Sequence, residues 1–232
     1  MQPTIELIVF DMAGTTVKDT GAIALAFQTA LQEVGYHVPL EQINPLMGYK
    51  KTEAIKKMLD LYEGDKARMT DEYVNTIHLR FLELMVEYYQ TTKDLEPLPH
   101  VENVFHSLKE RNIKVGLNTG FSKEITEVIV KRLGWVKNHL VDFVVSSNEV
   151  EAGRPHPFMI RNMMQKAGIT DSQKVVKVGD TEVDVAEGKN AGCLYSIGVT
   201  TGAFTREELE PYEPSFIIDD LAELIRIVDH HS

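Results

Sequence analysis

The sequence contains a single cysteine, Cys193, so no disulfide bond within the chain can stabilise the fold. It contains no apolar run long enough to span a membrane. The N-terminus also lacks the basic segment followed by an apolar stretch that marks a secretion signal. These absences argue against a disulfide-stapled secreted domain and against a membrane partner, and they predict a cytoplasmic protein.

Basic residues are scarce as well. Lys and Arg number 24 against 35 Asp and Glu, which gives a formal net charge of -11. Because nucleic-acid binding needs a basic surface, we expect no nucleic-acid partner. A small anionic substrate is compatible with this charge, since a local basic pocket can coexist with an acidic exterior. The 232 residues suffice for one substantial core, or for a core with a smaller second domain.

Two hydrophobic periodicities divide the chain. Residues 5–10 form a short apolar run rich in β-branched residues, which is typical of a buried strand in a parallel sheet. From about residue 20 to residue 89 the pattern is helical, and helices are expected near 23–34, 52–62 and 74–88. Beyond this region helices alternate with strands, which we expect at 113–117, 143–145, 175–178, 194–199 and 216–218.

Strands that alternate with helices predict a parallel sheet with right-handed crossovers. The fold class is therefore α/β: a doubly wound, Rossmann-like core with a helical cap inserted after the first strand. We expect the core to comprise residues 1–18 and 98–232, and the cap to comprise residues 19–97. Within the cap, residues 38–45 are expected to form a loop, and Thr52 is expected to cap the second helix.

Polar residues follow four of the predicted strands at the point where each strand ends. They occupy residues 11–15, 118–120, 153–157 and 179–184. Each stretch alone has an ordinary explanation, such as a turn, a helix cap or a surface residue. Open α/β sheets, however, hold their ligands at the carboxyl ends of parallel strands. We therefore expect the four stretches to meet in one site.

Together the four stretches offer a set of groups suited to phosphoryl chemistry. Asp11, Asp180 and Asp184 supply the hard oxygen ligands that Mg²⁺ prefers. Thr119 and Arg154 supply donors for a phosphoryl group. Asp11 is also available as a nucleophile.

These four motifs in this order, with a helical cap between the first and the second, resemble the haloacid dehalogenase superfamily of aspartate-nucleophile hydrolases over nearly the whole chain. The resemblance implies that Asp11 attacks phosphorus and forms an aspartyl-phosphate. It implies a Mg²⁺ cofactor bound by Asp11, the backbone carbonyl of Ala13, Asp180 and Asp184. The substrate site that it implies comprises Met12, Ala13, Met47, Thr119, Gly120 and Arg154.

Ala13 departs from most phosphatases of this superfamily, which carry a second Asp there as general acid and base. Loss of such a group costs roughly 10²–10⁴ in rate. Alanine here, together with Arg-Pro-His-Pro from Arg154 onward, resembles the phosphonoacetaldehyde hydrolase family. Those enzymes cleave a carbon–phosphorus bond after a cap lysine forms a Schiff base with the aldehyde. Lys51 matches that lysine by its spacing from Gly48.

Two further positions differ from that family. Ala54 stands where a helper histidine is expected one helical turn after the lysine, and Phe121 replaces an aromatic hydroxyl. Lys51 therefore has two other interpretations: a solvated residue of a lysine-rich helix, or a cap group that binds a substrate anion.

The leading hypothesis is a Mg²⁺-dependent hydrolase of phosphonoacetaldehyde or a related small phosphonate or phosphorylated metabolite. The first alternative is a small-molecule phosphate-ester phosphatase of the same superfamily. The second, from a different class, is a catalytically weak protein that binds a phosphorylated metabolite. Because related enzymes often pair through their caps, the resemblance also suggests a homodimer.

Overall fold

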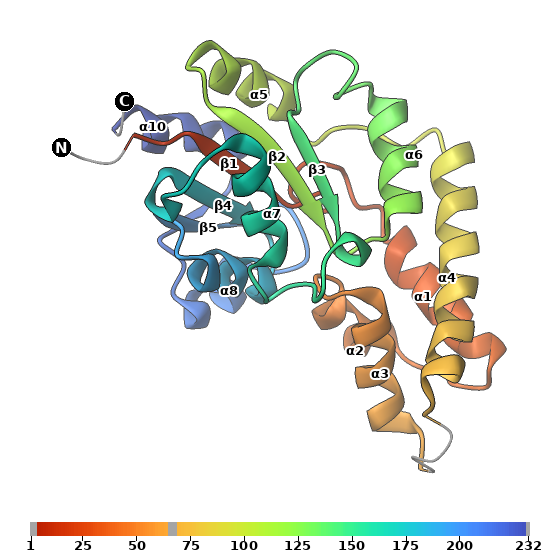
Figure 1. The fold of residues 1–232 in the computed structure, drawn as a ribbon. Coiled ribbons are helices and arrows are strands. Elements are labelled where there is room, and N and C mark those ends of the chain that lie inside the picture. The colour runs from red at the N-terminus through yellow and green to blue at the C-terminus, as the bar shows by residue number, and fades with distance from the viewer. Residues whose placement is uncertain (1–3, 65–68, 231–232) are drawn as a thin grey trace.

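The computed structural model describes residues 4–64 and 69–230, and its centre is a parallel sheet (Figure 1). Six strands lie in the order β3-β2-β1-β4-β5-β6, and every neighbouring pair is parallel. Their bounds are β1 Leu7–Phe10, β2 Lys114–Thr119, β3 Phe143–Ser146, β4 Val175–Gly179, β5 Tyr195–Val199 and β6 Phe216–Ile218. The order places β1 between β2 and β4, so the residues that follow β1 emerge at the middle of the sheet edge.

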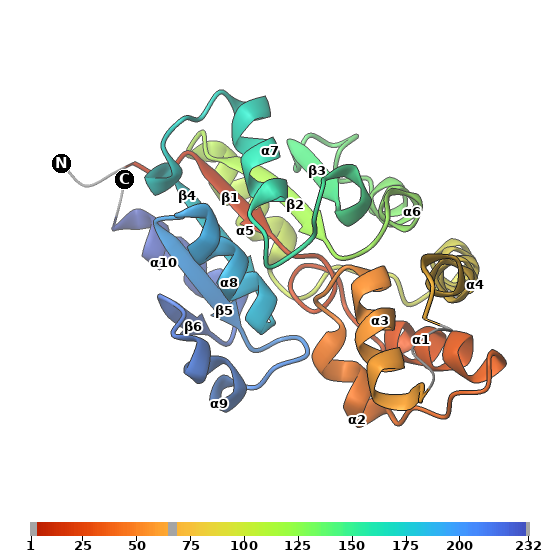
Figure 2. The same cartoon turned by 60° about the horizontal axis from the view of Figure 1, so that its bottom comes forward.

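Helices cover both faces of this sheet (Figure 2). They are α5 Val101–Glu110, α6 Lys123–Leu133, α7 Phe158–Ala167, α8 Glu182–Ala191, α9 Arg206–Leu209 and α10 Leu224–Asp229. Because side chains alternate along a strand, Ile8 and Phe10 belong to one hydrophobic cluster, whereas Leu7 and Val9 belong to another. The ring of Phe10 lies 5.3 Å from that of Phe105 on α5. A strand buried on both faces explains the unbroken apolar run at its start.

The cap consists of α1 Ala22–Glu33, α2 Leu40–Ile43, α3 Lys51–Tyr62 and α4 Asp71–Thr91. Two expectations here were wrong. Residues 38–45 are not a plain loop, because Leu40 and Ile43 share one turn of helix and bury Ile43. Thr52 does not cap α3, because the carbonyl of Lys50 already accepts the N–H groups of Glu53 and Ala54. Thr52 therefore lies inside the first turn.

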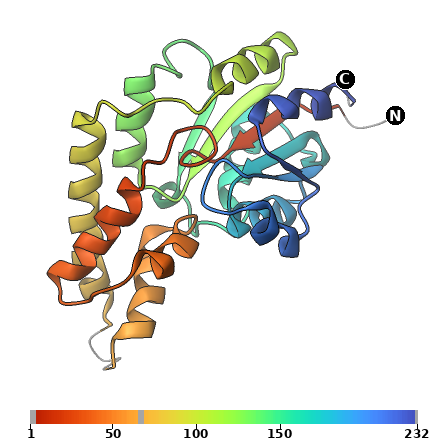
Figure 3. The same cartoon turned by 180° about the vertical axis from the view of Figure 1, so that it is seen from behind.

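The chain leaves and re-enters the sheet region through two segments that are hydrogen-bonded to each other. Leu98 N donates to Thr16 O at 3.0 Å, and Lys18 N donates to Glu96 O at 3.1 Å. Figure 3 shows the loop after β1 leading into α1. The predicted α/β class, with a helical insertion after the first strand, is confirmed. Within the described part of the chain, no helix is both long and apolar enough to cross a membrane.

Candidate active site

The loop after β1 is wound tightly at the carboxyl end of the sheet. Asp11 N donates to Val178 O of β4 at 2.9 Å, which fixes Asp11 beside that strand. Gly14 follows with φ +85°, and a Cβ there would lie 2.6 Å from Asp180 Oδ2. Only glycine accepts this conformation together with this close approach. The turn therefore brings the first and fourth motifs into direct contact.

Three buried carboxylates converge at this point. Asp11, Asp180 and Asp184 each offer one oxygen, and these oxygens all lie within 4.8 Å of one another. Asp180 Oδ1 accepts from Thr15 Oγ1 at 3.1 Å, and its Oδ2 accepts from Ala203 N at 2.7 Å. These two hydrogen bonds fix the orientation of the Asp180 carboxylate, and the three acids together form a cluster of hard oxygen donors.

Two buried cations face these acids. Arg154 Nη1 lies 2.7 Å from Asp11 Oδ1 and also bonds Asp184. Lys177 Nζ lies 3.0 Å from Asp184 Oδ1 and donates to Asn118 Oδ1 at 2.7 Å. Asp184 thus forms ion pairs with both cations, while Asp11 forms one with Arg154.

The charge balance within the cluster is uneven. Burial acts to raise the pKa of Asp184, but Arg154 and Lys177 together outweigh it and lower that pKa to about 2. Burial raises the pKa of Asp11, although Arg154 opposes the rise. Burial and repulsion from Asp11 and Asp184 raise the pKa of Asp180 well above its ordinary value. Repulsion among the three carboxylates is therefore compensated least at Asp180.

A divalent cation fits this arrangement. Mg²⁺ binds through one or two carboxylates together with water and substrate oxygens. Asp11 and Asp180 offer such oxygens in a buried site whose own cations leave their repulsion uncompensated. The donor set is all oxygen, which suits Mg²⁺ rather than a softer metal.

Lys51 brings a cap side chain to the same place. It begins α3, is only 3 % exposed, and donates to the carbonyl of Met47. Its Nζ lies 5.6 Å from the centroid of the Phe121 ring. Burial, with a smaller contribution from Arg154, lowers the pKa of Lys51 to about 7. Near neutral pH a large fraction of this amine is therefore uncharged, which is unusual for lysine.

Close backbone approaches hold the cap segment against the core. A Cβ on Gly48 would lie 2.4 Å from Thr181 Oγ1, and one on Gly120 would lie 2.6 Å from the carbonyl oxygen of Tyr49. The Tyr49 hydroxyl donates to Glu182 Oε1 at 3.0 Å. Glycine at these positions lets residues 47–51 reach the carboxyl ends of the strands.

A cavity lies between cap and core. The predicted residues that line it are Asp11, Ala13, Met47, Lys51, Thr119, Gly120, Arg154 and Asp180. The centre of a water molecule can reach about 30 Å³ of this cavity, which is room for roughly two water molecules. Movement of the cap away from the core would enlarge this space for a substrate.

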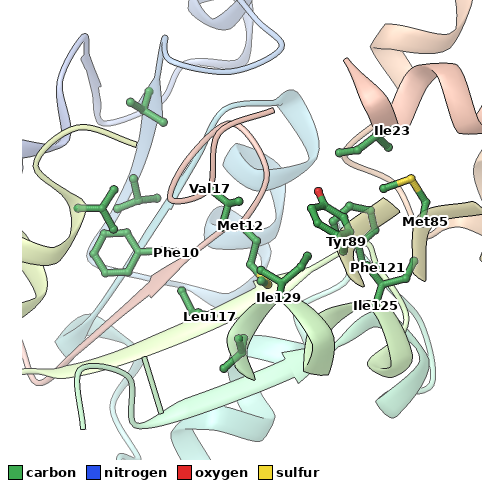
Figure 4. Packing of buried hydrophobic residues seen from close by; sticks show 14 of the residues in the cluster. Phe10, Met12, Val17, Ile23, Met85, Tyr89, Leu117, Phe121, Ile125 and Ile129 are labelled. Atoms are coloured by element: carbon green, nitrogen blue, oxygen red, sulfur yellow. The ribbon is translucent and has the colours of Figure 1, made fainter. Parts of the chain in front are cut away.

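Two predicted residues lie elsewhere. The side chain of Met12 is not part of the cavity lining; it is fully buried in the hydrophobic core, where Figure 4 shows it near Val17, Leu117 and Ile129. Asp184 is also outside the lining, although its carboxylate belongs to the acidic cluster.

The sequence interpretation missed a buried polar network behind Asp184. Lys177 and Glu187 are both fully buried, and Asn118 Nδ2 donates to both carboxylate oxygens of Glu187, at 2.9 and 2.8 Å. Burial raises the pKa of Glu187 to about 7. A signal existed: a lysine inside an otherwise apolar buried strand must have partners. Asp19, which also lines the cavity, was missed without any such signal.

Comparison with known proteins agrees with this fold. A family model for haloacid dehalogenase-like hydrolases matches residues 8–199. The chain belongs to this family and is a hydrolase.

Curated relatives in this family are named phosphonoacetaldehyde hydrolase. The protein of that name from Bacillus mycoides (strain KBAB4) is 31% identical over 240 residues, which cover 97% of this chain and 86% of the relative. Another from Latilactobacillus sakei subsp. sakei (strain 23K) is 35% identical over 199 residues, covering 82% of this chain and 74% of the relative.

Solved structures show the same fold. A phosphonoacetaldehyde hydrolase-like protein from Oleispira antarctica superposes with a TM-score of 0.86 at 21% identity, covering 99% of this chain and 93% of the other. A predicted phosphoglycolate phosphatase from Haemophilus somnus 129PT gives a TM-score of 0.79 at 21% identity, covering 96% of this chain and 97% of the other. At these identities the likeness shows the fold alone.

Proposed function

We propose that this hydrolase cleaves the carbon–phosphorus bond of phosphonoacetaldehyde, with Asp11 as nucleophile and Lys51 as the amine that forms a Schiff base. The observation that carries the proposal is a buried lysine with a pKa of about 7 in the same cavity as a strand-end aspartate. The relatives named phosphonoacetaldehyde hydrolase support the substrate.

In this mechanism Lys51 makes carbon a competent leaving group. The neutral amine attacks the aldehyde carbon, water leaves, and a protonated imine forms. Asp11 then attacks phosphorus, the carbon–phosphorus bond breaks, and its electron pair moves through carbon to the imine nitrogen, which leaves an enamine. Water then hydrolyses the aspartyl-phosphate to phosphate. The enamine takes up a proton at carbon, and water hydrolyses the resulting imine to acetaldehyde and free Lys51. An enamine needs no proton on departure, which accounts for an alanine at position 13.

Arg154 and Thr119 are placed to hold the phosphonate group. Arg154 is buried, and its Nε atom has no hydrogen-bond partner among the residues that the structure describes. This guanidinium therefore keeps a donor available for a phosphonate oxygen while it binds Asp11. The Thr119 hydroxyl accepts from Phe121 N at 3.1 Å, so its own proton is free to be donated.

Asp11, Asp180, Asp184 and the Ala13 carbonyl are the residues that would hold Mg²⁺ in this proposal. The ion, when bound, neutralises charge on the phosphonate oxygens and on the attacking carboxylate.

Activity is expected to depend on Mg²⁺. Exhaustive chelation should lower phosphate release by at least about 10²-fold, because buried acidic oxygens would otherwise repel a dianionic substrate. Phosphate release is measured before chelation, after chelation and after Mg²⁺ is restored. Full activity in the chelated enzyme would contradict the metal assignment.

A phosphate-ester phosphatase is the second candidate, and Ala54 favours it. This side chain is fully buried and offers no proton-transfer group near Lys51. The predicted phosphoglycolate phosphatase shares the fold, although its identity of 21% supports nothing finer.

Products distinguish the two candidates. With phosphonoacetaldehyde, the enzyme is expected to release phosphate and acetaldehyde in equal amounts. With phosphate esters such as phosphoglycolate, turnover should be roughly 10²–10⁴-fold lower, because Ala13 cannot protonate an alkoxide. Both products are measured across a panel of phosphonates and esters. Efficient ester hydrolysis without acetaldehyde release would establish the phosphatase instead.

We also propose the division into a core of residues 1–18 and 98–232 and a cap of residues 19–97. The hydrogen bonds that pair Thr16 with Leu98 and Lys18 with Glu96 support a hinge at this boundary. The homodimer and the cytoplasmic location stay predictions.

A further inference from the structure

Schiff-base formation at Lys51 needs proton transfers that the amine cannot complete alone. A proton must leave the lysine ammonium, and another must reach the carbinolamine hydroxyl so that water departs. Ala54 stands where the related family has a helper histidine, and Phe121 stands where it has an aromatic hydroxyl. Neither side chain carries a titratable group. Both are buried, at 0 % and 2 % exposure. Another residue of the cavity must therefore supply the transfers.

The titratable groups in the cavity lining leave one candidate. Asp11 is paired with Arg154 and is the nucleophile of the proposed reaction. Arg154 does not release its proton at physiological pH. Asp180 already accepts hydrogen bonds from Thr15 and Ala203. Apart from Lys51 itself, this leaves Asp19 among the titratable lining residues.

Asp19 is positioned at the mouth of the cavity. It belongs to the segment that leads from the core into α1, it lines the cavity, and it is exposed to solvent. Its Oδ1 accepts the N–H of Gly21 at 2.9 Å, which anchors the carboxylate and leaves Oδ2 for another partner. A group that faces both the cavity and the solvent can pass a proton in either direction.

We propose that Asp19 is the general acid and base of Schiff-base formation at Lys51, a role that rests on the proposed carbon–phosphorus cleavage. The Asp19 carboxylate takes the proton of the Lys51 ammonium, and the neutral amine adds to the aldehyde. The resulting carbinolamine hydroxyl takes the proton back from Asp19 and leaves as water. The imine retains one positive charge and Asp19 is again a carboxylate, so protons and charge balance.

Electrostatics agrees with this placement. Desolvation raises the pKa of Asp19, while the Gly21 N–H and the Lys51 ammonium oppose the rise. The charge of Asp19 in turn raises the pKa of Lys51, so the two groups are coupled electrostatically across the cavity that both line. The titratable and charged groups that act on this pair are Tyr89 and His78 from α4, and Asp11, Arg154 and Asp180 from the core.

The test is the rate of borohydride trapping with phosphonoacetaldehyde in the parent enzyme and in Asp19→Asn. Asparagine keeps the acceptor for Gly21 N–H but cannot take up a proton. We expect trapping at Lys51 and kcat to fall by about 10²-fold, and KM to change little because Arg154 and Thr119 still hold the phosphonate. Asp19→Glu should restore part of the rate.

Two further variants keep the test decisive. Asp19→Ser retains an oxygen for the Gly21 N–H and is expected to be as slow as Asp19→Asn. Glu96→Gln removes a carboxylate from the same hinge, where it pairs with Lys18 at 2.9 Å, and should change the rate less than twofold.

The outcomes distinguish failure of the proposed role of Asp19 from failure of the proposed Schiff-base reaction. A parent enzyme that forms no adduct overturns the Schiff-base proposal itself. A parent adduct that forms equally fast in Asp19→Asn, with an unchanged pH profile, overturns the role of Asp19 alone and leaves it a turn residue.

Discussion

Asp11→Asn is expected to lower turnover of phosphonoacetaldehyde by at least about 10⁴-fold, the largest loss that any single change in this chain should cause. Asparagine is nearly isosteric with aspartate, but its amide is not a competent nucleophile. Asp11 N still bonds Val178 O, so the backbone of the loop keeps its anchor. Phosphate release and thermal unfolding, measured on the same samples, distinguish lost chemistry from lost structure.

The matched control for this change is Asp171→Asn. Asp171 Oδ1 accepts the N–H of Gln173 at 2.9 Å outside the site, and asparagine can accept the same bond. This variant should retain parental turnover. A crystal grown with a fluoride complex that mimics the phosphoryl group should place the complex beside Asp11 in the parent enzyme. Substantial turnover in Asp11→Asn would rule out the nucleophilic role.

The fold could be predicted because its signals are local. The apolar run before Asp11 has the composition of a strand buried on both faces, and the structure buries Leu7, Ile8, Val9 and Phe10 completely. Parallel strands must end at the same edge, so motifs that follow different strands had to meet there. The order of the strands along the chain is enough for this prediction, and no distance between side chains is required.

What the sequence could not predict depends on distances between elements. Lys177 of β4 contacts Asp184 of α8 and Asn118 of β2 because these three elements pack side by side. The hydrophobic periodicity of the sequence does not indicate which polar side chains of different elements meet. Asp19 follows the first motif in a polar segment that looks like an ordinary linker. Only the folded chain places it on the same cavity as Lys51, which lies 32 positions further along the chain.

The two departures from the phosphonoacetaldehyde hydrolase pattern acquire a physical meaning in the structure. Ala54 and Phe121 replace polar groups with apolar ones, and both are buried near Lys51. The Phe121 ring packs edge-on against Tyr89 of α4, with 5.9 Å between ring centroids, so water has little access from that side. Burial, to which these apolar neighbours contribute, is the main reason that the pKa of Lys51 falls to about 7. The same changes that remove a helper thus favour the neutral amine.

This desolvation sets the expected pH dependence of the amine. Because burial lowers the pKa of Lys51 to about 7, the neutral form increases as the pH rises through 7. Borohydride trapping in the parent enzyme should therefore rise between about pH 6 and pH 8 and then level off. A lysine in water, with a pKa near 10.4, would give a rate that still rises at pH 9.

Lys51→Arg is expected to lower phosphonoacetaldehyde turnover by roughly 10⁴-fold, because a guanidinium keeps the charge but cannot form an imine. Turnover of a phosphate ester, if the parent enzyme has any, should stay within about threefold, since that reaction needs no Schiff base.

The control is Lys56→Arg on the same helix, where the exposed lysine pairs with Asp71 at 2.8 Å and arginine can replace it. Peptide mass spectrometry after borohydride reduction should find the adduct on Lys51 in the parent and in Lys56→Arg, and on no peptide of Lys51→Arg. If Lys51→Arg still released acetaldehyde at the parental rate, carbon–phosphorus cleavage through this lysine would be wrong. Lys51 would then serve only to bind the substrate anion from the cap.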